Sequence, residues 1–205
     1  MNKYEQLKRE LSQRVLYRGA TRLSSHVESK ERAIETENNS DATFILISEN
    51  NETNRYDWWS GETFIEELDV KGADFSELKT FFKDHNPSVD NAIGKVEDLR
   101  IEGSQLLAGV SFGSDDNSQT IKQKYNDEIL TDVSIGYRIN ELILTEKKGE
   151  PDHVLVTDYS IVELSAVWKG ADSGAIKIKN DATDEVKEKR FSYDLYEKKL
   201  NSQKG

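Results

Sequence analysis

The sequence of 205 residues predicts a β-rich α+β domain. Stretches with an apolar residue at every second position, the pattern of a strand with one buried face, follow one another between residues 42 and 168. Only a few segments have the three-to-four-residue spacing of a helix, and no repeat of about 20–50 residues indicates a solenoid or a propeller. A succession of strands with few inserted helices is typical of a β-rich α+β fold or a β-barrel.

The chain is expected to open with a short basic helix within residues 1–18. Four side chains at spacings of three and four would share one face of this helix: Tyr4, Leu7, Leu11 and Val15. Gly19 is a plausible end for it, because glycine readily adopts the backbone conformation that follows a helix. A helix this short packs on its own domain or frays, since it makes few internal hydrogen bonds.

Two further helices are predicted, over residues 74–84 and 118–130. In the first, DFSELKTFFKD, Asp74 and Glu77 have the spacing of a capping box, which satisfies backbone N–H groups at a helix start. The second has the sequence SQTIKQKYNDEIL. Strands are predicted in four regions: ATFILIS (42–48), two strands around Gly103-Ser104 (99–113), TDVSIGYRINELIL (131–144) and HVLVTDYSIVELSAVW (153–168).

Two of these strand regions have informative patterns. ATFILIS is apolar on both faces and is therefore expected to be buried. The region 131–144 alternates cleanly between an apolar and a polar face: Val133, Ile135, Tyr137 and Ile139 against Asp132, Ser134, Gly136 and Arg138.

Charge is distributed unevenly along the chain and divides it into three parts. The sequence has 28 Lys and Arg against 39 Asp and Glu, a net charge of −11. Residues 1–33 carry a net +4 and residues 181–205 sum to zero, so residues 34–180 carry −15. We therefore divide the chain into a basic N-terminal helix or arm that leads into the first strand (1–33), an acidic body (34–180) and a charged C-terminal tail (181–205).

The composition argues against several classes of function. An acidic chain does not suit nucleic acid as a partner, because phosphate backbones attract basic surfaces. No apolar run of about 18 residues predicts a membrane span, and we expect no secretory signal in MNKYEQLKRE, which has no apolar core. Without cysteine, the chain has no disulfide, no thiolate nucleophile and no sulfur-ligated zinc.

We expect neither a metal site nor a cofactor. The three histidines, His26, His85 and His153, form no HExxH motif and no pair at ligand spacing. The acidic stretch SDDNS (114–118) lacks the alternating oxygen ligands and the glycine of a calcium loop, which favours a solvated turn. The glycines of KGADSG (169–174) are not followed by the Lys-Ser/Thr of a phosphate-binding loop.

Three residues could together perform nucleophilic catalysis. Ser134 is the candidate nucleophile, since a serine on a central strand is held rigidly, but it needs a base. His85 is the best candidate base, because it lies at a predicted helix end where Pro87 stiffens the following loop. Glu163 is the one carboxylate in the apolar run SIVELSAVW, where a buried carboxylate normally has a partner. Each also has an ordinary interpretation: a strand serine, a solvated loop histidine and a charge at a sheet edge.

Several segments resemble the prohead (capsid maturation) proteases of tailed bacteriophages. DHNPSVDNAIGKVEDLRIEGSQLLAGVSFG (84–113) is similar to the family's (N/D)H(D/N) segment with the (P/A)IG(R/K/V)V and L.A.V.F patterns that follow it. DEILTDVSIGYRI is similar to the nucleophile segment LxxxSIGY/FR, and IVELSAVWKGADSGAIKI to ELS(L/V)VxxPADxGA. NRYDWW and FIEEL resemble the charged and aromatic lead-in. The resemblance covers residues 40–180 in collinear order, with Trp168-Lys169-Gly170 in place of a proline-containing segment.

The resemblance implies a fold, an activity and a site. It implies a β-barrel akin to the herpesvirus assembly proteases for residues 34–180, with a few peripheral helices. It implies a serine endopeptidase with Ser134 as nucleophile, His85 as general base and Glu163 as the orienting acid, working without a cofactor. Gly136 could permit close approach of the backbone at the oxyanion, and Arg138 could bind substrate, although a plain salt bridge is the simpler role for Arg138. The resemblance implies nothing for residues 1–18 and 181–205.

The family's biology implies partners and a location. The substrates would be the scaffold protein and extensions of the major capsid protein, with the chain's own ends as further candidates, inside the assembling prohead in the host cytoplasm. Two alternatives remain open: a catalytically degenerate family member that acts as a scaffold or assembly factor, and a β-barrel binding module unrelated to capsids. A homo-oligomer is a further open alternative, and neither nucleic acid nor a membrane is expected as a partner.

Overall fold

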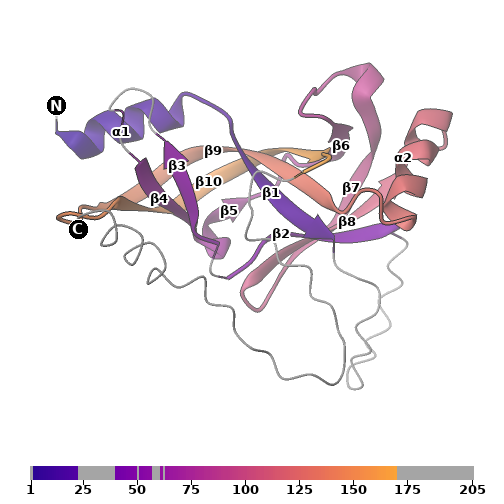
Figure 1. Cartoon of the computed structure of the whole chain (residues 1–205). Helices are drawn as coiled ribbons and strands as arrows, with labels where there is room; N and C mark the ends of the chain where they lie inside the picture. The colour runs from indigo at the N-terminus through magenta and orange to yellow at the C-terminus, as the bar shows by residue number, and fades with distance from the viewer. Residues whose placement is uncertain (1, 23–39, 50, 57–60, 62, 170–205) are drawn as a thin grey trace, which may run out of the picture.

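The structure is a computed structural model, which describes residues 2–22, 40–49, 51–56, 61 and 63–169 (Figure 1). Within these residues the regular elements follow in the order α1 (Lys3–Ser12), β1 (Leu16–Arg22), β2 (Ala42–Ile47), β3 (Thr53–Tyr56), β4 (Thr63–Leu68), β5 (Ala73–Asp74), β6 (Thr80–Lys83), β7 (Ala92–Glu102), β8 (Gln105–Phe112), α2 (Asp116–Asn126), β9 (Asp132–Thr145) and β10 (Asp152–Ala166). Short 3-10 turns lie at Val70–Gly72 and Val89–Asn91.

The strands form one mixed sheet that curls strongly (Figure 1). β9 and β10 pair antiparallel along most of their length. The other edge of β10 pairs in parallel with three short strands in turn, β4, β5 and β6. From β6 the pairing continues through β7, β8, β2 and β1 and returns to β9. The prediction of a β-rich α+β fold is confirmed.

Aromatic side chains fill part of the interior of this curled sheet. Rings from β2, β6, β8 and α2 contact one another: Phe44, Phe81, Phe112 and Tyr125. The hydroxyl of Tyr125 donates a hydrogen bond of 2.7 Å to the carbonyl oxygen of Asp132. This bond joins α2 to the first residue of β9, the strand that carries the candidate nucleophile.

The four predicted strand regions are confirmed. They correspond to β2, to the hairpin of β7 and β8, to β9 and to β10. In β9 the apolar face is buried as expected, but Ser134 and Gly136 on the opposite face are buried as well, and that face becomes exposed from Arg138 onward. Other parts of the chain therefore cover the polar face of β9 near its start.

The helix predicted over residues 74–84 is wrong. The side chain of Asp74 accepts a hydrogen bond of 3.0 Å from the backbone of Ser76, and Leu78 N donates to Phe75 O, so the chain makes a turn here. Glu77 is exposed and completes no capping box. The last residues form β6, in which Phe81 is fully buried between β7 and β10. Threonine and phenylalanine favour strands when a sheet offers partners, and this pairing prevails over the helical spacing.

The N-terminal helix is shorter than the sequence predicts. α1 ends at Ser12, and its buried residues Leu7 and Leu11 pack into the core. β1 follows at Leu16, so Gly19 lies inside a strand, opposite Ser134 of β9, and does not end a helix. Residues 16–21 pair with β9, and this pairing stabilises an extended conformation where the spacing of apolar residues predicted the end of a short helix. The part of residues 1–33 that the structure describes therefore packs on the body of the protein.

The helix predicted over residues 118–130 is present as α2, which begins two residues and ends four residues earlier than predicted. Asp115 is its N-cap and accepts a hydrogen bond of 3.0 Å from the backbone of Ser118. The acidic stretch 114–118 is thus a helix start rather than a solvated turn. The predicted tail (181–205) and His26 lie outside the described residues. In the described part of the chain, no helix has the length and apolar character needed to cross a membrane.

Candidate active site

Strand pairing places the predicted nucleophile and acid on the same face of the sheet. In the antiparallel pair of β9 and β10, Ser165 lies opposite Ser134 and Glu163 opposite Gly136. Directly opposite residues in antiparallel strands point to the same side of the sheet. Ser134, Gly136, Glu163 and Ser165 therefore share one face, which we call the site face.

A β-bulge turns Glu163 onto the site face. Ile161 pairs with Tyr137, but the next paired residue, Glu163, is opposite Gly136, so Val162 is an extra residue in β10. Without the bulge, the alternation of a strand would direct Glu163 toward the same side as Ile161, into the apolar core. The bulge thus moves the carboxylate out of the core and toward His85.

His85 reaches the site face from a tight turn after β6. Asp84 and His85 both have left-handed backbone conformations, with φ of 55° and 52°. Asp84 N donates to Ala166 O at 2.9 Å, which fixes the turn beside the end of β10. Left-handed non-glycine residues cost on the order of 1 kcal/mol or more each and persist where the surroundings hold them. The sequence placed His85 at a helix end; it follows a strand instead.

His85 and Glu163 form a hydrogen-bonded pair. Nδ1 of His85 lies 2.9 Å from Oε1 of Glu163. An ionised carboxylate only accepts hydrogen bonds, so in this contact Nδ1 of His85 is the donor. Glu163 is 4% exposed, and β9 and β6 flank β10 at this point, so Glu163 is not a surface charge at a sheet edge.

Ser134 is buried, and its hydroxyl is hydrogen-bonded to a backbone carbonyl. It is 1% exposed, and its Oγ donates to the carbonyl oxygen of Arg18 in β1 at 3.0 Å. Among the described residues no hydrogen bond joins Ser134 to His85. To pass its proton to His85, the hydroxyl has to give up its hydrogen bond to the Arg18 carbonyl. Catalytic hydrogen bonds are often incomplete when no substrate is bound.

The two remaining predicted site residues differ in their settings. Gly136 lies in the centre of the site face, where a Cβ atom would come within 3.0 Å of Glu163 Cβ and 3.0 Å of Tyr17 Cε1. Its lack of a side chain makes room for the glutamate and the tyrosine. Arg138 is exposed, opposite Ser160 of β10. Within the described part of the chain, no hydrogen bond or ion pair joins Arg138 to another candidate residue.

Replacing Gly136 with alanine should destabilise the fold by about 1–3 kcal/mol, because the added methyl group overpacks the contact between Glu163 and Tyr17. The free energy of unfolding in urea measures this effect. Arg138→Ala, exposed two residues along the same strand, is the control and should stay within about 0.5 kcal/mol of the original protein. Equal stability of the two variants would contradict this prediction, because the site face would then accommodate a methyl group at position 136.

Two residues of the site face escaped the sequence analysis. Ser165 is fully buried and donates a hydrogen bond of 2.6 Å to Oε1 of Glu163, the same oxygen that His85 contacts. Its spacing of two from Glu163 could have indicated a shared face. The ring of Tyr17 lies against the imidazole of His85, with centroids 4.1 Å apart. No sequence signal pointed to Tyr17, since its segment was predicted as a helix.

Another group of titratable side chains surrounds His153 of β10, away from the site face. Nε2 of His153 is 3.2 Å from a carboxylate oxygen of Glu67 and 3.6 Å from one of Glu52. Their possible ligand atoms lie within 4.8 Å of one another. The sequence assigned no such neighbours to His153. Because the side chain of Glu52 is 60% exposed and that of Glu67 is 36% exposed, this group is explained by ordinary surface ion pairs.

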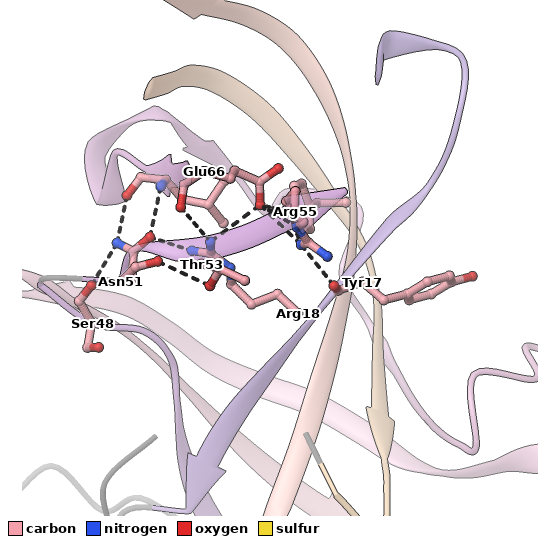
Figure 2. A network of polar contacts seen from close by, with 9 residues as sticks. Tyr17, Arg18, Ser48, Asn51, Thr53, Arg55 and Glu66 are labelled. Carbon is pink, nitrogen blue, oxygen red and sulfur yellow. Dashed lines mark hydrogen bonds and ion pairs between the residues drawn. The ribbon is translucent and has the colours of Figure 1, made fainter. Parts of the chain in front are cut away.

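A buried polar cluster lies on the side of β1 opposite the Tyr17 ring (Figure 2). We call it the Glu66 cluster, and it consists of Arg18, Asn51, Arg55, Glu66 and Tyr137. Oε1 of Glu66 is 3.3 Å from Arg18 and 3.1 Å from Arg55, and it also accepts a hydrogen bond from the hydroxyl of Tyr137. Asn51 accepts from Arg18 and from the backbone of Leu68. Burial and the charge of Glu66 raise the pKa of the Tyr137 phenol far above its usual range, so Tyr137 remains a donor.

Replacing Glu66 with alanine should cost about 3–5 kcal/mol of stability, because Arg18 would remain buried without a carboxylate partner. The side chain of Arg18 is 1% exposed and that of Glu66 is 0% exposed. Urea unfolding measures the loss. Glu67→Ala, the next residue on β4 with a partly exposed side chain, is the matched control and should change stability by less than about 1 kcal/mol. A loss below 1 kcal/mol for Glu66→Ala would contradict the role of this cluster in holding β1.

Comparisons with protein-family models, with curated proteins and with solved structures found no match to this chain.

Proposed function

We propose that this protein is a serine endopeptidase in which Ser134, His85 and Glu163 form the catalytic triad. The observation that carries the proposal is the 2.9 Å contact between His85 Nδ1 and Glu163 Oε1, on the face of the sheet that also carries Ser134. This contact orients Nε2 as the free base of the ring, as a serine peptidase requires.

The proposed reaction begins when the hydroxyl of Ser134 leaves the Arg18 carbonyl and turns toward His85. Oγ attacks the scissile carbonyl carbon, and Nε2 of His85 accepts the hydroxyl proton. Nε2 then returns this proton to the leaving amine as the peptide C–N bond breaks, which leaves an acyl ester on Ser134. A water molecule, deprotonated by His85, hydrolyses the ester and restores the hydroxyl. The carboxylate of Glu163 stabilises the imidazolium in both steps.

The resemblance to prohead proteases supports a proposal for substrates and location. The substrates would be the scaffold protein and extensions of the major capsid protein, with the chain's own ends as further candidates, inside the assembling prohead in the host cytoplasm. The circuit of pairings from β6 through β9 to β10 supports the further proposal of a barrel akin to the herpesvirus assembly proteases.

A fluorophosphonate probe, which forms a covalent bond with activated serines, tests the catalytic proposal directly. The full chain should gain the mass of one probe molecule, as measured by intact-protein mass spectrometry. Full occupancy by a single adduct is the expected result. A chain that stays unmodified while a known serine peptidase in the same tube is labelled would contradict the proposal.

Co-expression with a capsid protein and a scaffold protein tests the proposed substrates. The partners should be those encoded beside this chain in its own genome. Mass analysis of the products should show capsid and scaffold proteins shortened at defined sites. If the chain reacts with the probe but the capsid and scaffold proteins stay intact, the chain is a serine peptidase with a different substrate.

A catalytically degenerate relative that acts as an assembly factor is the second candidate. The bond from Ser134 to the Arg18 carbonyl and the 1% exposure of Ser134 favour it. The probe separates the two candidates, because an unassembled triad does not activate its serine.

A further inference from the structure

β1 brings an aromatic ring against the candidate base. The ring of Tyr17 packs on the imidazole of His85 with centroids 4.1 Å apart and an interplanar angle of 52°. Tyr17 belongs to a segment for which the family resemblance implies nothing. We infer that Tyr17 is a positioning residue for His85, an inference that rests on the proposed function.

Strand register places Tyr17 on the site face. Tyr17 lies opposite Gly136 across the pair of β1 and β9, and Gly136 lies opposite Glu163 across the pair of β9 and β10. Directly opposite residues share a face, so Tyr17 and Glu163 both flank the bare backbone of Gly136. The imidazole of His85 contacts both of them. The ring therefore limits His85 on one side, while the carboxylate fixes Nδ1.

The backbone of Tyr17 is anchored from behind by the Glu66 cluster. Arg55 donates a hydrogen bond of 3.0 Å to the Tyr17 carbonyl oxygen and pairs with Glu66 (Figure 2). In Figure 2 the Tyr17 side chain points away from the cluster, on the other side of β1. The next carbonyl, that of Arg18, accepts the hydroxyl of Ser134. β1 thus positions two groups of the site: the Tyr17 ring, which contacts His85, and the Arg18 carbonyl, which accepts the hydrogen bond of Ser134.

The ring, and not the hydroxyl, performs this role. Burial and the negative charge of Glu163 raise the pKa of the Tyr17 phenol, so it stays neutral and does not compete as a base. The imidazole is partly open to solvent, with a side-chain exposure of 27%, and the Tyr17 ring covers part of the remainder. Without the ring, the imidazole could rotate away from Ser134 and gain solvent. Small displacements of a catalytic group are enough to slow a reaction strongly.

Two measurements on the full chain test the inference with Tyr17→Ala and Tyr17→Phe. The rate of fluorophosphonate labelling should fall about 10-fold or more in Tyr17→Ala, because the base loses its position. The same rate should remain close to the original in Tyr17→Phe, which keeps the ring. Carbethoxylation of His85 by diethyl pyrocarbonate, located by peptide mass mapping, should become several-fold faster in Tyr17→Ala only. His153 in the same sample is the internal control, and thermal unfolding confirms that both variants are folded.

The outcomes distinguish this inference from the proposed function. If the original chain is not labelled at all, the proposed function fails, and carbethoxylation still tests whether Tyr17 shields His85. Labelling of Tyr17→Ala at the original rate would overturn the positioning role. Slower labelling with unchanged carbethoxylation of His85 would overturn it too, because Tyr17 would then act elsewhere. Slow labelling of Tyr17→Phe would assign the effect to the hydroxyl and contradict the role of the ring.

Discussion

Replacing Ser134 with alanine should abolish fluorophosphonate labelling and the cleavage of capsid and scaffold proteins. The hydroxyl is the only group of the proposed triad that bonds to the substrate, and without it no acyl intermediate forms. The fold should survive, because the change removes one oxygen atom and one hydrogen bond, to the Arg18 carbonyl. The loss of that bond costs about 1 kcal/mol.

Ser111→Ala is the matched control for this experiment. Ser111 is also a strand serine whose hydroxyl donates a hydrogen bond, in its case to a carboxylate oxygen of Glu97, but it lies on β8 outside the site face. This control should be labelled as fast as the original chain. Persistent labelling or cleavage in a folded Ser134→Ala protein would remove Ser134 from the mechanism, and Ser165, directly opposite it, would be the next residue to test.

Replacing Glu163 with glutamine should slow labelling and cleavage by about 10³–10⁴-fold. Glutamine keeps the size of the side chain but removes the charge that stabilises the imidazolium. Its amide can also donate to Nδ1, which would favour the tautomer whose Nε2 carries the hydrogen and cannot accept a proton. The second-order rate constant of probe labelling measures the effect.

Glu97→Gln is the control for Glu163→Gln. Glu97 likewise accepts a hydrogen bond from a serine, Ser111. It lies on β7, which β6 separates from β10. It contacts no imidazole among its described partners. This variant should be labelled at the original rate. A decrease of less than about 10-fold in Glu163→Gln would contradict an orienting role for Glu163.

The strands could be predicted from the sequence because their patterns are local. The alternation of Val133, Ile135, Tyr137 and Ile139 shows one buried face of β9 without any knowledge of its partners. β6 could not be found in the same way. It is four residues long, and its extended conformation depends on pairing with β7 and β10, which are distant in the sequence. The helical spacing of apolar residues in 74–84 therefore predicted a helix, in spite of the strand propensity of Thr80 and Phe81.

Three residues of the candidate site could be predicted from the sequence, but Ser165, Tyr17 and the geometry of the site could not. Glu163 and His85 were selected from separate segments, and the structure places them in hydrogen-bond contact. The bulge at Val162, which turns Glu163 onto the site face, could not be predicted from the pattern of apolar and polar residues in β10. The contact of Tyr17 with His85 depends on the register of β1 against β9, and register is a property of the folded sheet.

The position of the probe adduct tests the central claim, the triad of Ser134, His85 and Glu163, most directly. Digestion of the labelled full chain and fragmentation of the modified peptide identify the serine that reacted. We expect the adduct on Ser134 alone, at a rate that falls to the background when His85 is replaced by alanine. An adduct on any other serine, or labelling that does not depend on His85, would contradict the triad.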